Sequence, residues 1–270
     1  MGISTNDSKM IVLVTPTGCR REQINLCKMF MERQTYTGKV TWIIVDDCTP
    51  RTTDQIINGF RGNWTVLKIY PHPPYGGVNT QARNMIAGFN CIDANFKPED
   101  IEAVFIIEDD DYYKPQYLER MMARFDGYKV LGEMNTVYYN VLYRTYFVNR
   151  NTSHSSLFQI ALRPEMMPLF RSCFTEKFID FKFYEKLHAQ EFVRRGEVGF
   201  FNEDNLAVGM KGIPGRAGIG AGHGRLLNML PDPGLIYLNK ILINGDSKFY
   251  EGYYLNRRSA QHPLLANRRR

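Results

Sequence analysis

The chain has 270 residues and a mass of 31.3 kDa, enough for one large domain or two small ones, which excludes a disulfide-stapled mini-protein. Hydrophobic residues make up 44% and charged residues 23% of the sequence, so a disordered, collagenous or coiled-coil chain is excluded too. The net charge of +6 is uneven, because residues 206–270 hold ten Lys or Arg and three acidic residues. Such a basic segment either meets phosphate groups or forms a solvated tail.

The cysteines and the apolar runs indicate where in the cell the protein is located. The five cysteines contain no CxxC pair, so we expect reduced thiols rather than a disulfide framework or a structural zinc site. The longest apolar runs, such as residues 10–14 and 104–107, are too short to cross a bilayer, and residues 1–7 lack the apolar stretch of a signal peptide. The expectation is a soluble cytoplasmic protein without a membrane span, located in the host cytoplasm if the protein is viral.

The first half of the chain alternates short apolar runs with longer amphipathic stretches. Strands are predicted at residues 10–14, 40–45, 64–70 and 103–107, and helices at residues 20–33, 53–60, 80–91 and 116–125. This alternation predicts an α/β fold with a mostly parallel sheet and helices on both faces. Ligands of such sheets bind at the carboxyl ends of the strands.

The pattern changes after residue 128. We predict one or two strands in residues 137–148, strands at 157–162 and 235–243, and helices at 164–170 and 181–194. Residues 205–224 contain seven glycines. The chain therefore divides into a regular half, residues 1–128, and an irregular half, residues 129–270, which we expect to share one continuous core.

Four adjacent carboxylates follow the fourth predicted strand, at Glu108, Asp109, Asp110 and Asp111. Such a cluster at a strand end is costly without a compensating cation, and hard oxygen ligands suit Mg²⁺ or Mn²⁺ held jointly with a diphosphate. The alternative is an acidic loop that caps the helix beginning near Pro115.

A second acidic pair, Asp46 and Asp47, follows the second predicted strand. A carboxylate at this edge can accept hydrogen bonds from a nucleobase or a ribose. Taken alone, an Asp pair before a helix is more often a helix cap. The combination of the four-residue acidic run, this pair and further motifs is more specific than any one of them.

The order and spacing of four motifs resemble the GT-A glycosyltransferases, particularly their family 2 branch. The motifs are Val14-Thr-Pro-Thr17, Ile44-Val-Asp-Asp47, Gln81-Ala-Arg-Asn84, and Ile107-Glu-Asp-Asp-Asp111 followed by Pro115 and Leu118. The match covers residues 10–125. One departure is Glu108, which stands where family members usually have Asp. The resemblance implies a Rossmann-like GT-A fold in which residues 1–128 bind a nucleotide sugar and residues 129–270 bind the acceptor and carry catalysis.

The resemblance also implies roles for single residues of the first half. Thr15 and Pro16 would line the nucleotide base, and Asp46 or Asp47 would pair with uracil or an equivalent ring. Arg83 would lie near the diphosphate. The acidic run would be the DxD motif, with Asp109 and Asp110 toward the donor, Asp109 nearer the ribose, and Asp109 and Asp111 as metal ligands for Mn²⁺ or Mg²⁺.

In the second half, Asp180 opens a predicted helix and resembles the family's catalytic base, while Asp204 of the Glu203-Asp204 pair competes for that role. The alternative for Asp180 is a helix cap. The glycine-rich segment contains no Walker motif, but Lys211 and Arg216 could neutralise the charge on a leaving nucleotide. The resemblance also implies His223 as an extra metal ligand; the alternative is that the glycine-rich segment is only a mobile surface loop.

The resemblance implies a metal-dependent, inverting transfer of a sugar from a nucleoside diphosphate, UDP favoured, to a hydroxyl group. For the acceptor we consider a hydroxylated pyrimidine in phage DNA, because the C-terminal quarter is basic. A saccharide or lipid acceptor is the alternative, and a nucleotidyltransferase is a second alternative.

Overall fold

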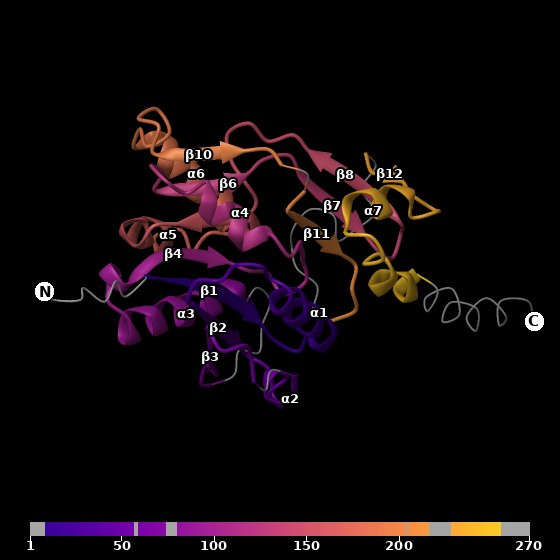
Figure 1. Cartoon of the computed structure of the whole chain (residues 1–270), viewed down its shortest axis with the longest axis horizontal. Coiled ribbons are helices and arrows are strands. Elements are labelled where there is room, and N and C mark those ends of the chain that lie inside the picture. The colour runs from indigo at the N-terminus through magenta and orange to yellow at the C-terminus, as the bar shows by residue number, and fades with distance from the viewer. Residues whose placement is uncertain (1–8, 57–58, 74–79, 204, 216–227, 255–270) are drawn as a thin grey trace, which may run out of the picture.

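The computed structural model describes residues 9–56, 59–73, 80–203, 205–215 and 228–254 (Figure 1). In this part of the chain every helix is too short or too polar to cross a lipid bilayer. The two halves expected from the sequence meet within one sheet, because strands from both lie side by side in it.

A seven-stranded sheet in the order β10-β6-β9-β4-β1-β2-β3 forms the centre of the molecule. Its strands are β1 (Met10–Thr17), β2 (Val40–Asp46), β3 (Trp64–Ile69), β4 (Ile101–Ile106), β6 (Val130–Glu133), β9 (Ile160–Leu162) and β10 (Val198–Phe201). Strands β3, β2, β1 and β4 are parallel, and β10 is parallel to β6. Only β9 runs antiparallel to its neighbours, β4 and β6, among these strands. The predicted mostly parallel α/β fold is confirmed.

Helices cover both faces of this sheet. The helices of the described residues are α1 (Arg21–Glu32), α2 (Thr53–Ile56), α3 (Gln81–Asn95), α4 (Tyr117–Ala123), α5 (Met167–Arg171), α6 (Ile179–Ala189) and α7 (Ile236–Ile241), with 3₁₀ turns η1 (Pro98–Asp100), η2 (Leu157–Gln159) and η3 (Pro164–Met166). Ile11 and Leu13 of β1 pack in one hydrophobic cluster with Ile24 of α1. Val12 packs in a second cluster with Phe89 of α3, so alternate side chains of β1 serve opposite layers.

A second sheet, in the order β12-β8-β7-β11-β5, lies beside the first (Figure 1). Its strands are β5 (Tyr112–Tyr113), β7 (Thr136–Asn140), β8 (Thr145–Asn149), β11 (Ala207–Lys211) and β12 (Leu230–Pro231). Strand β5 follows the acidic run directly, and β11 pairs with it antiparallel. This pairing brings the end of β11 beside the acidic run although about a hundred residues separate them in sequence.

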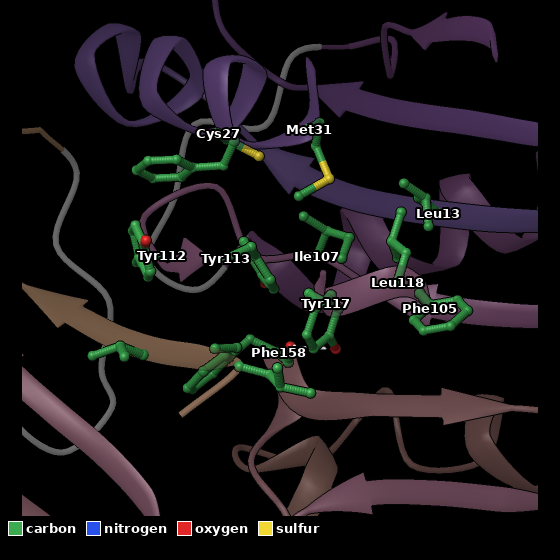
Figure 2. Packing of buried hydrophobic residues seen from close by; sticks show 14 of the residues in the cluster. Leu13, Cys27, Met31, Phe105, Ile107, Tyr112, Tyr113, Tyr117, Leu118 and Phe158 are labelled. Carbon is green, nitrogen blue, oxygen red and sulfur yellow. Dashed lines mark hydrogen bonds between the residues drawn. The ribbon is translucent and has the colours of Figure 1, made fainter. Parts of the chain in front are cut away.

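Aromatic side chains fill the space between α1 and the second sheet. Figure 2 shows Tyr112, Tyr113 and Tyr117 between Cys27 of α1 and Phe158 of η2, and all five side chains are buried. The Tyr117 hydroxyl donates a hydrogen bond to the carbonyl oxygen of Phe158 at 3.2 Å. The polar tip of this core tyrosine is therefore satisfied, and the residues that follow the acidic run are fixed by packing.

The strand predicted at residues 235–243 is wrong, because this segment contains the helix α7. Leu238, Ile241 and Leu242 are buried at helical spacing. The carboxylate of Asp232 accepts hydrogen bonds from the backbone amides of Tyr237 and Leu238, both at 3.0 Å, so it caps the start of the helix. A short apolar run leaves strand and helix ambiguous, and the Asp232 cap decides between them.

The expectation of reduced thiols is wrong for two of the five cysteines. Cys19 and Cys48 form a disulfide bond with a Cα–Cα distance of 4.9 Å, while Cys27, Cys91 and Cys173 are free and buried. The cause is sheet register, because Thr17 of β1 lies opposite Asp46 of β2 and the residues after each strand therefore meet. A sequence separation of 29 residues gives no such signal.

Candidate functional site

The acidic run lies at the carboxyl end of β4, beside the carboxyl ends of β1 and β2. Asp109 and Asp111 are each 1% exposed and Asp110 is 8% exposed, so these aspartates line the interior rather than the outer surface. The backbone amide of Glu108 donates a hydrogen bond to the Tyr113 hydroxyl at 2.9 Å, and Gln81 of α3 donates one to the Glu108 carboxylate. The run is thus fixed from both sides of the sheet.

Arg20 and Thr17, which end β1 and precede α1, hold the first two aspartates. The Arg20 guanidinium donates to Asp109 Oδ1 at 2.7 Å and to Asp110 Oδ2 at 2.6 Å. The Thr17 hydroxyl donates to Asp109 Oδ2 at 2.5 Å, so both oxygens of Asp109 accept hydrogen bonds. One planar guanidinium therefore sets the spacing of two neighbouring carboxylates.

Lys211, the last residue of β11, holds the third aspartate. Its ammonium lies 3.1 Å from Asp111 Oδ1 and 3.9 Å from Asp110 Oδ2. The backbone amide of Met210 also donates to Asp111 Oδ1, at 2.9 Å. The negative charges of Asp110, Asp111 and Glu108 outweigh burial and raise the pKa of Lys211, so the side chain stays charged although it is buried.

The cluster contains more carboxyl groups than cations. Its four carboxylates face two cations, Arg20 and Lys211. Burial raises the pKa of Glu108 to about 7 and that of Asp109 to about 6, and the neighbouring Asp110 adds to both shifts while Lys211 and Arg20, respectively, oppose them. Burial also raises the pKa of Asp111 well above its ordinary value. A further cation beside these groups would stabilise their ionised forms.

The donor chemistry of the cluster fits a hard divalent cation. Asp111 Oδ2 is buried and accepts no hydrogen bond from the residues that the structure describes, so one carboxylate oxygen is available as a ligand. Within the same residues, no three His, Cys, Asp or Glu side chains are grouped around a common metal position. Mg²⁺ is usually held by one or two carboxylates with substrate phosphates and water, so such a cage is not required.

Asp46 and Asp47 lie at the end of β2, at the same edge of the sheet. Asp46 is committed to the local turn, because its two oxygens accept hydrogen bonds from the backbone amides of Cys48 at 3.0 Å, Thr52 at 2.8 Å and Thr53 at 2.9 Å. This is the capping arrangement that the sequence left open as an alternative. Asp47 is buried, and its backbone amide donates to the carbonyl oxygen of Thr17 at 3.3 Å.

The remaining residues predicted for the donor differ in their exposure. Thr15 and Pro16 lie buried in β1, and the Thr15 hydroxyl accepts a hydrogen bond from the Trp42 indole at 2.9 Å. The Thr15 side chain is thus committed to the core. Arg83 is exposed in the first turn of α3, the helix that also supplies Gln81.

Asp180 lies in the first turn of α6, with Phe178 rather than Asp180 at the N-cap position. Its carboxylate accepts a hydrogen bond from the backbone amide of Phe181 at 2.9 Å. Burial raises the pKa of Asp180, opposed by that backbone hydrogen bond and by His154. The charge of Asp180 in turn adds to the rise in the pKa of Glu108.

Three predicted residues, Asp204, Arg216 and His223, lie outside the described residues. Glu203, the neighbour of Asp204, forms ion pairs with Arg120 and Arg124 of the α4 region.

Sequence reasoning missed the contributions of Arg20, Thr17 and Gln81. A signal for Arg20 exists, because a basic residue at a helix start opposes the helix dipole and needs a compensating partner. Asp109 and Asp110 are that partner. Thr17 and Gln81 carry no comparable signal, since their contacts depend on the sheet register.

No family model matches the sequence, and no curated protein matches it. Among solved structures, TarS of S. aureus, residues 1–349 in complex with UDP-GlcNAc, matches with a TM-score of 0.51 and 14% identity over 97% of this chain and 76% of that chain. The same TarS fragment in complex with UDP matches with a TM-score of 0.44 and 18% identity over 60% of this chain and 48% of that chain. In that alignment the chain spans about half the length of the TarS structure.

The likeness to TarS bears on architecture. It extends over nearly the whole of this chain in the complex with UDP-GlcNAc. At this level of identity the comparison establishes the fold. The chain therefore has the fold of a GT-A glycosyltransferase.

Proposed function

We propose that this protein is a glycosyltransferase that moves a sugar from a nucleoside-diphosphate sugar, UDP-linked, to an acceptor hydroxyl. The observation that carries the proposal is the buried acidic run at the carboxyl end of β4, enclosed by Arg20 and Lys211 in a GT-A fold. The TarS structure with UDP-GlcNAc supports a uridine donor as the first choice. Ligands of open α/β sheets bind at this edge.

In the proposed reaction, two cationic side chains hold in place the aspartates that face the donor diphosphate. Arg20 and Lys211 orient the aspartates and reduce their mutual repulsion. The same cations favour the negative charge that develops on the departing diphosphate, and Arg216 is proposed to add to this effect. Asp47, which lies buried at the same edge of the sheet, is proposed to accept a hydrogen bond from the uracil ring, whereas Asp46 is proposed to hold the local turn.

The proposed cofactor is Mn²⁺ or Mg²⁺, held by Asp111 with Asp109 and His223 as further candidates. When bound, the ion would act as a Lewis acid that withdraws negative charge from the diphosphate. Asp111 is the strongest candidate because its Oδ2 is buried and accepts no hydrogen bond from the described residues. Both oxygens of Asp109 already accept hydrogen bonds, from Thr17 and Arg20.

For the catalytic base we propose Asp180, with Asp204 as the alternative. A base must approach the acceptor hydroxyl from the face opposite the leaving group, and a rigid helix start holds Asp180 in one place. Its raised pKa makes the carboxylate a stronger base than an exposed aspartate. A single displacement with this base inverts the configuration at the sugar carbon.

The test is a screen of UDP-sugars with Mn²⁺ or Mg²⁺ that measures released UDP and released pyrophosphate separately. The proposal expects UDP release from at least one sugar nucleotide, with water as a slow acceptor when none is added. Pyrophosphate release without UDP would identify a nucleotidyltransferase instead. A pH profile of Asp180→Asn beside one of an Asp204→Asn variant assigns the base, because the base acts only when it is deprotonated and the variant that removes it loses the acidic limb of the profile.

For the acceptor we propose a hydroxylated pyrimidine of DNA. The basic excess of residues 206–270 supports phosphate contact, and the aromatic side chains of Phe178 and Phe181, 47% and 60% exposed, flank Asp180 and offer a surface for a flipped base. Binding to duplex DNA should weaken steeply as salt rises. If the protein does not bind DNA at micromolar concentration in low salt and transfers the sugar to a saccharide or lipid, the acceptor is that saccharide or lipid and not DNA.

A further inference from the structure

We propose that the Cys19–Cys48 disulfide positions the nucleotide-binding edge, so that its reduction weakens donor binding. This inference rests on the proposed function, because it assumes that the edge formed by β1, β2 and β4 holds the donor diphosphate. The bond joins the segment between β1 and α1 to the segment between β2 and α2. Both segments follow strands at the carboxyl edge of the sheet.

On the β1 side the disulfide adjoins the residue that holds the acidic run. Cys19 has a positive φ of 54°, a backbone conformation that costs energy for a side chain other than glycine and that the surrounding contacts must hold. The next residue, Arg20, donates to Asp109 and Asp110. A covalent bond at Cys19 therefore restricts the backbone from which the guanidinium reaches the two carboxylates.

On the β2 side the disulfide adjoins the turn held by Asp46. The backbone amide of Cys48 donates to Asp46 Oδ1 at 3.0 Å. Between the two segments, the backbone amide of Asp47 donates to the carbonyl oxygen of Thr17, whose hydroxyl donates to Asp109. The disulfide thus closes a ring of contacts that includes the proposed uracil acceptor, Asp47, and the acidic run.

Solvent reaches the disulfide, whereas the three free thiols are buried. Cys19 is exposed and Cys48 is half-buried. Cys27, Cys91 and Cys173 are buried free thiols, and burial raises the pKa of each, which lowers the fraction of reactive thiolate. A thiol reagent in solution therefore reaches this one pair first.

The redox step is thiol–disulfide exchange. A dithiol attacks one sulfur of the bond, the mixed disulfide resolves, and two electrons and two protons pass to Cys19 and Cys48 while the dithiol becomes a cyclic disulfide. Glutathione disulfide reverses the reaction and is itself reduced to two glutathione thiols. With the bond open, Arg20 and the turn at Asp46 must be ordered again when a nucleotide binds.

The experiment measures UDP binding by calorimetry with Mg²⁺, on the full chain oxidised by glutathione disulfide and on the same chain reduced by dithiothreitol. We expect the dissociation constant for UDP to rise roughly 3- to 10-fold on reduction, the cost of ordering one or two side chains again. The double variant Cys19→Ser/Cys48→Ser keeps the three buried cysteines and serves as the control. It should bind UDP like the reduced protein and should not respond to dithiothreitol.

Two further readouts separate positioning from general stabilisation. All titrations are made well below the thermal unfolding midpoint of the reduced protein, where loss of stability alone leaves UDP affinity unchanged. Mass spectrometry after native alkylation should find Cys19 and Cys48 labelled only after reduction. Labelling without reductant, or equal UDP affinity in the two states, overturns the inference; failure of the oxidised protein to bind UDP overturns the proposed function and this inference with it.

Discussion

The two carboxylate oxygens of Asp111 differ in their contacts, because one is held by hydrogen bonds within the protein and the other is left for a ligand. Oδ1 accepts hydrogen bonds from Lys211 and from the backbone amide of Met210, whereas Oδ2 is buried and accepts none from the described residues. A carboxylate retained with an unused buried oxygen costs stability, which points to a ligand rather than to packing.

Asp111→Asn should therefore remove function without unfolding the protein. The amide oxygen can keep both Oδ1 contacts, and loss of one negative charge relieves repulsion within the acidic run. We expect UDP release from a sugar nucleotide to fall by at least about 100-fold and the free energy of unfolding in urea to fall by less than about 1 kcal/mol.

The matched control is Asp126→Asn, at an exposed residue after α4. It should leave both quantities unchanged. If Asp111→Asn retained full activity and a full Mg²⁺ dependence of UDP binding, the assignment of Asp111 would be wrong.

For single residues, the sequence indicates which residue types lie together at the site but not which hydrogen-bond partners each side chain has. A run of four acids after an apolar strand predicts a charged site at the sheet edge, and the aspartates do lie there. The cap role of Asp46 and the commitment of Thr15 to Trp42 depend on the turn after β2 and on strand register. Neither is visible in the residue types alone.

Glu133 connects elements of the two sheets. It ends β6 of the first sheet, and its carboxylate accepts hydrogen bonds from the backbone amides of Leu206 at 3.0 Å and Ala207 at 3.2 Å, at the start of β11 in the second. Gln159 donates to the same carboxylate at 3.0 Å. Burial nevertheless dominates and raises the pKa of Glu133 from 4.5 to about 7.

This pKa gives the protein a pH-dependent stability. Because the folded state binds the proton more tightly than the unfolded state, the contribution of Glu133 is full below pH 4.5 and is lost as the pH rises through about 7. Between pH 5 and pH 8 the loss should be about 3 kcal/mol or less. Urea titrations of the Glu133→Gln variant should show a correspondingly smaller decline, whereas an equal decline in variant and wild type would contradict the assignment.

Gly88 sets how closely α3 approaches the sheet. A methyl group at this position would lie 2.7 Å from Val14 Cγ1 and 3.3 Å from Val45 Cγ2. Gly88→Ala should lower the free energy of unfolding by about 1–3 kcal/mol, although alanine favours helix. The control Gly62→Ala, where no atom lies within 4 Å of the added methyl group, should be neutral; a stable Gly88→Ala protein would show that α3 can move away.

The elements of the first half follow the sequence closely because β1, β2 and β4 are buried strands and α1 and α3 are long amphipathic helices. Strands β1 to β4 and helices α1, α3 and α4 lie within a few residues of the apolar runs that predict them. The second half follows less well. Strand β11 lies inside the glycine-rich segment, where Gly209 is required because a side chain there would meet the Tyr138 ring at 2.5 Å.

For the whole molecule, the disulfide should contribute to stability by restricting the unfolded chain. It closes a loop of 29 residues, for which chain-entropy models give about 3–4 kcal/mol. Dithiothreitol should lower the free energy of unfolding of the wild type by that order and leave Cys19→Ser/Cys48→Ser unaffected. An unchanged wild-type value would mean that the two cysteines are not bonded in solution.

The central claim about the whole molecule is that the buried acidic run binds the diphosphate of a nucleotide sugar. The most direct test is a crystal structure with UDP and Mn²⁺, in which anomalous scattering locates the ion. We expect the ion on Asp111, with the diphosphate between the acidic run and the end of β11. UDP bound elsewhere, with Arg20 and Lys211 still holding all three aspartates and no ion beside them, would contradict it.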